Sequence, residues 1–150
     1  MTWKVLITDY VWPNIEPEKK VIEASGGEVV VAPDSSEETL IALAKDVDVI
    51  MTCFAQVTDN VIESAKKCVA IGRFGVGVDN ISVKKATELG IPVTYVPDYC
   101  MEEVSDHVLA LLHTWNRKIA LFDKSVKDEG WGHLKLSMRI MRLREKVLGI

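Results

Sequence analysis

The feature that most restricts the fold is a unit of apolar strand, turn and amphipathic helix that recurs through residues 1–100. The strand segments are short and rich in β-branched residues: 5–7, 29–31, 47–52, 69–71 and 93–96. The segments read as mainly apolar runs rather than as an alternation, which is typical of strands covered on both faces. Five such strands alternating with helices predict a parallel sheet joined by right-handed crossovers. We therefore expect an α/β fold with a flavodoxin-like, five-stranded parallel sheet and helices on both faces.

Capping residues mark the helices between these strands. Pro17 stands at a helix start and Gly26-Gly27 past its end, which is the usual asymmetry. Ser35 and Glu38 have the spacing of a capping box for the next helix. Thr58 is expected to cap the helix after that one.

After Pro97 the pattern changes to one long amphipathic helix. Its apolar residues recur at i, i+3, i+4, i+7, i+8 and i+11, and therefore share one face. This apolar stripe consists of Val104, His107, Val108, Leu111, Leu112 and Trp115. Weaker helical patterns follow over 119–145, and 146–150 reads as the opening of a further strand, which suggests that the chain is cut there.

Composition excludes several classes of protein. Apolar residues make up 48% of the 150 residues and charged residues 27%, which is ordinary for a globular chain. A net charge of −4 and the lack of long basic runs argue against a nucleic acid or an anionic membrane as partner. No apolar run is long enough to span a membrane. The N-terminus lacks a signal-peptide layout, and three widely spaced cysteines favour a reducing cytoplasm over disulfides or a metal site.

The segment GRFGVGVDN, residues 72–80, carries three glycines directly after the fourth strand. Read from Gly75, it nearly matches the GxGxxG fingerprint of dinucleotide-binding loops, but Asn80 stands where the third glycine is needed. Glycines at the carboxyl end of a parallel strand can instead expose amides as an anion-binding nest, suited to a carboxylate. A plain glycine turn, with Asp79 or Asn80 capping the next helix, is the alternative.

The run IGRFGVGVDNISVKKATELGIPVTYVPDYCMEEVSDHVLALL, which begins at Ile71, resembles the D-isomer-specific 2-hydroxyacid dehydrogenases. The resemblance is strongest to the branch near the C-terminal-binding proteins and phosphoglycerate dehydrogenases. Its GxGxDN segment, the GIPV strand start and the EVSDH helix start match in order and spacing. The family has a substrate domain and an NAD-binding Rossmann domain that opens with a strand and GxGxxG.

This resemblance implies roles for particular residues. The amides of Val76 and Gly77 would bind the substrate carboxylate, and the Arg73 cation would help to attract it. Val104 would approach the nicotinamide of NAD or NADP, and Cys100 lies where relatives carry a cleft-facing polar residue. The family's catalytic Arg, Glu and His would all follow residue 150, so we assign no catalytic residue and no metal ligand to this chain.

The resemblance also implies a division of the chain. Residues 1–100 would form the flavodoxin-like substrate domain, 101–145 a crossing helix and dimerisation arm, and 146–150 the first strand of an NAD-binding domain. We expect an oxidoreductase that interconverts 2-hydroxy and 2-oxo acids as a homodimer, with this portion inactive by itself. The alternative is a non-enzymatic interaction or small-anion-binding module, similar to a C-terminal-binding-protein scaffold.

Overall fold

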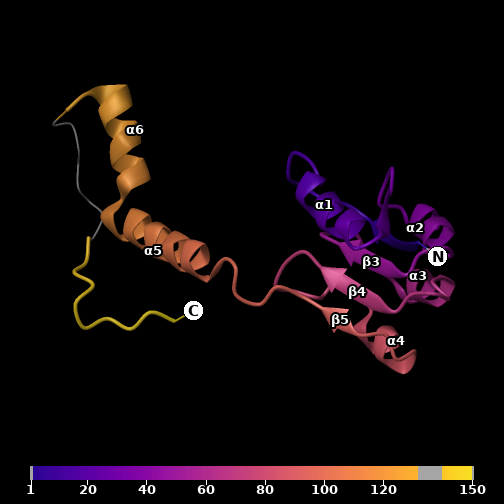
Figure 1. Cartoon of the computed structure of the whole chain (residues 1–150). Coiled ribbons are helices and arrows are strands. Elements are labelled where there is room, and N and C mark those ends of the chain that lie inside the picture. Colours follow the sequence, from indigo (N-terminus) through magenta and orange to yellow (C-terminus); the bar gives the residue numbers. More distant parts are fainter. Residues whose placement is uncertain (1, 132–139, 150) are drawn as a thin grey trace. The chain divides into compact units, whose positions relative to one another are not determined.

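The computed structural model describes residues 2–131 and 140–149, which form two compact units, Met1–Tyr99 and Cys100–Ile150. The first unit is an α/β sheet domain (Figure 1). Its elements are β1 Trp3–Ile7, α1 Glu16–Ala24, β2 Gly27–Val31, α2 Glu37–Ala44, β3 Val49–Thr52, α3 Asp59–Ser64, β4 Ala70–Arg73, α4 Val83–Glu88 and β5 Val93–Thr94. The strands are all parallel and have the order β2-β1-β3-β4-β5. This is the flavodoxin-like order, so the predicted fold class is confirmed.

Neighbouring strand residues point to opposite faces of the sheet, and both faces have a core. Leu6, Ile50 and Ile71 are fully buried in a cluster with side chains of α2, α3 and α4. Val5 and Ile7, one position away on β1, pack on the other face with Ile22 of α1 and its neighbours. Helices therefore cover both faces, as predicted, although only α1 lies on the second face within this unit.

The helix caps follow the sequence prediction at one helix and depart from it at another. The Thr58 hydroxyl accepts a hydrogen bond from the Val61 amide at 3.4 Å and caps α3 as expected. The cap of α2 is Ser36 rather than Ser35, and its hydroxyl accepts from the Thr39 amide at 3.4 Å. The predicted capping box with Glu38 is therefore wrong by one residue, because two adjacent serines offer the same cap chemistry.

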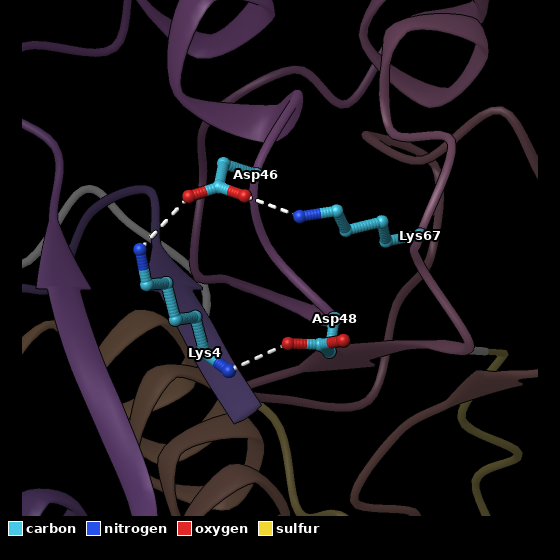
Figure 2. A network of polar contacts seen from close by, with 4 residues as sticks. All are labelled: Lys4, Asp46, Asp48 and Lys67. Carbon is cyan, nitrogen blue, oxygen red and sulfur yellow. Dashed lines mark hydrogen bonds and ion pairs between the residues drawn. The ribbon is translucent and has the colours of Figure 1, made fainter. Parts of the chain in front are cut away.

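Charged residues tie the strands together at the amino edge of the sheet (Figure 2). The main-chain amide of Lys4 donates a hydrogen bond to the Asp48 carboxylate at 2.7 Å. The side-chain ammonium of Lys4 donates to the Asp46 carboxylate at 2.8 Å. The hydrogen bonds from Lys4 and Lys67 lower the pKa of Asp46 to about 2. These contacts hold β1 beside β3 at the edge opposite to that where the loops after the strands gather.

The second unit contains α5 Met101–Arg117 and α6 Ile119–Glu129. Lys118 joins the two helices in a left-handed conformation, with φ of 57°. The buried side chain of Asn116 donates to the Met141 carbonyl at 3.0 Å and accepts from its amide at 3.3 Å. Residues 146–149 are not in a strand, and the strand expected over 146–150 stays a prediction, since Ile150 lies outside the described residues.

The apolar stripe of α5 is largely uncovered. Val104, Leu111 and Trp115 are 57%, 58% and 61% exposed. No helix among the described residues has the length and apolar character needed to cross a membrane.

The two-faced core predicts a position-dependent cost for shortening valines in the sheet. Val5→Ala should lower the free energy of unfolding by about 2 kcal/mol, because it empties volume that the surrounding side chains cannot refill. Val31→Ala, in the neighbouring strand, is the matched control, since Val31 is 41% exposed. We expect it to cost less than about 1 kcal/mol. Urea unfolding measures both, and equal costs would contradict this packing.

Candidate functional site

Three loops meet at the carboxyl edge of the sheet, where open α/β sheets place ligands. They follow β1, β3 and β4 and cover 8–12, 53–57 and 74–80. These strands are neighbours in the sheet, so their ends lie side by side although the loops are distant in sequence. The amide of Phe74 donates to the Thr52 carbonyl at 2.9 Å, which extends the pairing of β3 and β4 into this edge.

The carboxylate of Asp9 fastens the second of these loops to the end of β1. It accepts hydrogen bonds from the amides of Cys53 at 2.9 Å and Phe54 at 2.7 Å, and from the Thr8 hydroxyl at 2.8 Å. Burial by itself raises the pKa of Asp9, but these hydrogen bonds outweigh it and hold the pKa below the ordinary value. Asp9 is therefore a charged structural residue that shapes the loop.

Asn80 fastens the same loop to the glycine segment from the other side. Its side-chain amide donates to the carbonyls of Ala55 at 2.9 Å and Cys53 at 3.4 Å. The main-chain carbonyl of Asn80 accepts a hydrogen bond from the Val57 amide at 2.8 Å. Neither Asp79 nor Asn80 caps α4, whose N-cap is Ser82, so the capping role considered for these two residues is wrong. Asn80 stands in place of a glycine because this position joins two loops.

The glycine segment leaves two amides free at the site. Within the part of the chain that the structure describes, the amides of Val76 and Gly77 donate to no chain atom. Val76 is 44% exposed. A Cβ on Gly75 would lie 1.5 Å from the Arg73 guanidinium, so the glycine makes room for the arginine. Among the described residues, a Cβ on Gly77 would meet no atom closer than 3.5 Å, so none of them requires a glycine there.

Arg73 extends from the end of β4 beside these amides. Its guanidinium donates to the Phe74 carbonyl at 3.1 Å and lies 5.7 Å from the ring centre of Phe54. Among the described residues it forms no ion pair, so its charge is not neutralised by a carboxylate of the chain. A cation and two free amides on one loop form an arrangement suited to a small anion such as a carboxylate.

The structure brings together some of the residues that the sequence singled out. Arg73 ends β4, and Val76 and Gly77 lie in the loop that follows it in the first unit, as expected for neighbours in sequence. Cys100 and Val104 belong to the second unit, where Cys100 is the N-cap of α5 and Val104 lies in its first turns with an exposed side chain. The role expected for each of these five residues stays a prediction.

Sequence reasoning missed the residues that shape the site. The sequence pattern assigns no role to Asp9, and it marks Asn80 only as a departure from a fingerprint or as a candidate helix cap. Their spacing from Cys53 carries no local signal, because the contact depends on the strand order. Burial and the charge of Asp9 raise the pKa of the Cys53 thiol, which makes it a poor nucleophile. No group of metal-binding side chains occurs among the described residues.

The hydrogen bonds that the Asp9 carboxylate accepts predict that the stability of the fold depends on pH. Because the pKa of Asp9 is lowered by folding, its carboxylate stabilises the fold above its unfolded-state pKa, and this contribution is lost as the pH falls through the folded-state pKa. Asp9→Asn should lower the free energy of unfolding at pH 7 by about 2 kcal/mol. This deficit relative to the unaltered chain should be smaller at a pH below the folded-state pKa of Asp9, since both chains then carry an uncharged side chain at this position.

Urea unfolding at the two pH values measures this difference. Asp128→Asn, on the exposed face of α6, is the matched control and should change stability by less than about 0.5 kcal/mol. If Asp9→Asn lowered the free energy of unfolding by the same amount at both pH values, the stabilising role of the Asp9 charge would be contradicted.

Comparison with known proteins shows the family of the chain. The family model described as the D-isomer specific 2-hydroxyacid dehydrogenase, catalytic domain, matches residues 5–140. The D-3-phosphoglycerate dehydrogenase of Methanocaldococcus jannaschii is 38% identical over 148 residues, which is 98% of this chain and 27% of the relative. The glyoxylate reductase of Pyrococcus furiosus is 37% identical over 95 residues, 63% of this chain and 28% of the relative. The chain thus spans about a quarter of the length of these curated relatives.

A solved structure has the same fold. The crystal structure of a protein from Pyrococcus horikoshii OT3 matches with a TM-score of 0.76 and 28% identity, over 95% of this chain and 43% of that one. The family match covers nearly all of the sheet unit and the long helix after it. The chain therefore belongs to the D-isomer specific 2-hydroxyacid dehydrogenase family and contains its catalytic-domain portion.

Proposed function

We propose that this chain is the substrate-domain part of an NAD(P)-dependent oxidoreductase that interconverts 2-hydroxy acids and 2-oxo acids. The observation that carries the proposal is the pair of free amides at Val76 and Gly77, held at the carboxyl edge of the sheet beside the unpaired charge of Arg73. Membership of the dehydrogenase family supports the reaction type.

In this proposal the chain's own residues bind and orient the acid. The substrate carboxylate accepts hydrogen bonds from the Val76 and Gly77 amides, and the Arg73 guanidinium attracts it into the site. Because Asp9 and Asn80 fix the neighbouring loop, the amides need little rearrangement when the acid binds. Holding the carboxylate fixes C2 in position, and such positioning lowers the barrier of the step that follows. The acid-base residue is proposed to lie outside this chain.

The cofactor is proposed to contact this chain at Val104 and Cys100. When bound, a nicotinamide cofactor exchanges a hydride with C2 of the acid. The exposed Val104 side chain on α5 offers an apolar surface that an aromatic ring could contact. The glycine segment does not fit a pyrophosphate, because the helix after it begins only at Val83 and runs for six residues. A pyrophosphate normally binds directly at a helix N-terminus.

The proposal predicts which amides respond to an acid. Titration of the ¹⁵N-labelled chain with lactate should shift the backbone signals of Val76 and Gly77, because their N–H groups gain an anionic acceptor. Gly77→Ala should weaken lactate binding about tenfold, since a Cβ there would crowd the carboxylate while meeting no chain atom closely.

Leu89→Ala, on an exposed side chain at the end of α4, is the control and should leave the affinity for lactate unchanged. Lactate shifts confined to other residues would overturn the carboxylate site. Sulfate binding as tightly as lactate would favour the alternative of a general anion-binding module.

We also propose that the apolar stripe of α5 forms the contact of a homodimer. The exposed Val104, Leu111 and Trp115 support this, because contiguous exposed apolar surface commonly marks an interface.

The proposed compartment is the cytoplasm, which the three free cysteines support.

The dimer proposal is tested by mass in solution. Light scattering at micromolar concentration should give twice the chain mass of 16.7 kDa. Leu111→Glu should return the chain to a monomer, because a charge cannot be buried in the contact without a partner. Ala110→Glu, one residue away and off the apolar stripe, is the matched control and should stay dimeric. A monomeric mass for the unaltered chain would refute the proposal.

A further inference from the structure

A cavity of about 360 Å³ lies beside the glycine segment, within the first unit. Gly75 is one of its lining residues, and the free amides belong to the next two residues of the chain, Val76 and Gly77. Most of its wall is aromatic or aliphatic: Val11, Trp12, Phe54, Phe74, Val96 and Tyr99. An acid held by its carboxylate at Val76 and Gly77 therefore has this cavity next to the rest of its carbon skeleton.

The aromatic side chains of the wall are suited to an aromatic occupant. Trp12 meets Phe74 edge-on, with ring centres 5.0 Å apart and planes at 79°. Phe54 lies under the Arg73 guanidinium and is nevertheless 63% exposed, which is unusual for a large apolar side chain. Rings that already pack edge-on, together with an uncovered ring, favour a further ring over a short aliphatic group.

Three polar atoms of the same wall have no hydrogen-bond partner among the described residues. They are the indole Nε1 of Trp12, Oε2 of Glu18 and Nε of Arg73, and all three are buried. Buried polar atoms are normally paired, so these indicate that the wall is completed by something else. Two are donors and one is an acceptor, and an uncharged hydroxyl group can pair with either kind because it both donates and accepts. A second carboxylate would face the negative charge of Glu18, whereas Arg73 of the same wall is already engaged by the first carboxylate in the proposed function.

We propose that this cavity binds the side chain of the acid, and that this side chain is an uncharged aromatic ring that carries a hydroxyl group. The inference rests on the proposed function, since it takes the carboxylate to bind at Val76 and Gly77. The preferred substrates are then 2-hydroxy and 2-oxo acids with a phenol-like side chain. Acids as small as lactate leave the aromatic wall uncovered, and dicarboxylic acids such as malate bring a charge against Glu18.

Competing acids and two sets of NMR signals test this inference. Titration of the 150-residue chain with 4-hydroxyphenyllactate should shift the indole N–H signal of Trp12 as well as the amides of Val76 and Gly77. Lactate should shift the two amides and leave the Trp12 indole in place. The aromatic acid should bind at least about tenfold more tightly than lactate or malate, as expected for burial of a ring. Phenyllactate lacks the hydroxyl group, and its affinity should lie between that of 4-hydroxyphenyllactate and that of lactate.

Phe54→Ala should remove most of the preference for the aromatic acid over lactate, whereas Leu89→Ala should leave that preference unchanged. Equal affinities for lactate and 4-hydroxyphenyllactate, or an unmoved Trp12 indole with shifted Val76 and Gly77 amides, would overturn the inference while the proposed function stands. If no acid shifts the two amides, the proposed function itself fails. Equal affinities for phenyllactate and 4-hydroxyphenyllactate would show that the hydroxyl group is not recognised, and would overturn that part of the inference.

Discussion

The hydrogen bonds of a single carboxylate determine the form of the site. Asp9 stands where β1 ends, and it accepts the amides of Cys53 and Phe54 from the loop after β3. Those amides would otherwise lack partners in a partly buried turn, and the carboxylate would lack compensation for its burial. With this contact made, the loop presents the Phe54 ring beside Arg73. Asn80 holds the loop from the opposite side, so the glycine segment lies against a fixed neighbour.

This arrangement requires the sheet beneath it. β1 lies next to β3, and β3 next to β4, so three strands bring their carboxyl ends to one place. The two cores keep that register, because a slip by one residue would exchange the buried side chains of Leu6 and Val5 between faces. The free amides of Val76 and Gly77 are thus supported by rigid elements, which is where binding groups are held most reliably.

The fold could be predicted well because its signals are local. β-branched apolar runs, caps such as Thr58 and stops such as Gly26-Gly27 each act over a few residues. Where local signals were ambiguous, as between Ser35 and Ser36, the prediction was off by one residue. The glycine segment was also visible in sequence, and the family resemblance assigned it to the substrate rather than to the cofactor. Its role in binding is still a proposal.

The sequence by itself determined that residues 1–100 contain alternating strands and helices, and that Arg73, Val76 and Gly77 lie close together at the end of the fourth strand, because these follow from neighbours along the chain. Only the tertiary structure decided what surrounds that loop. Asp9 lies beside Cys53, Asn80 beside Ala55, and Trp12 beside Phe74, through pairings between segments distant in sequence. No local pattern encodes such pairings, since they depend on strand order and on packing across the sheet edge.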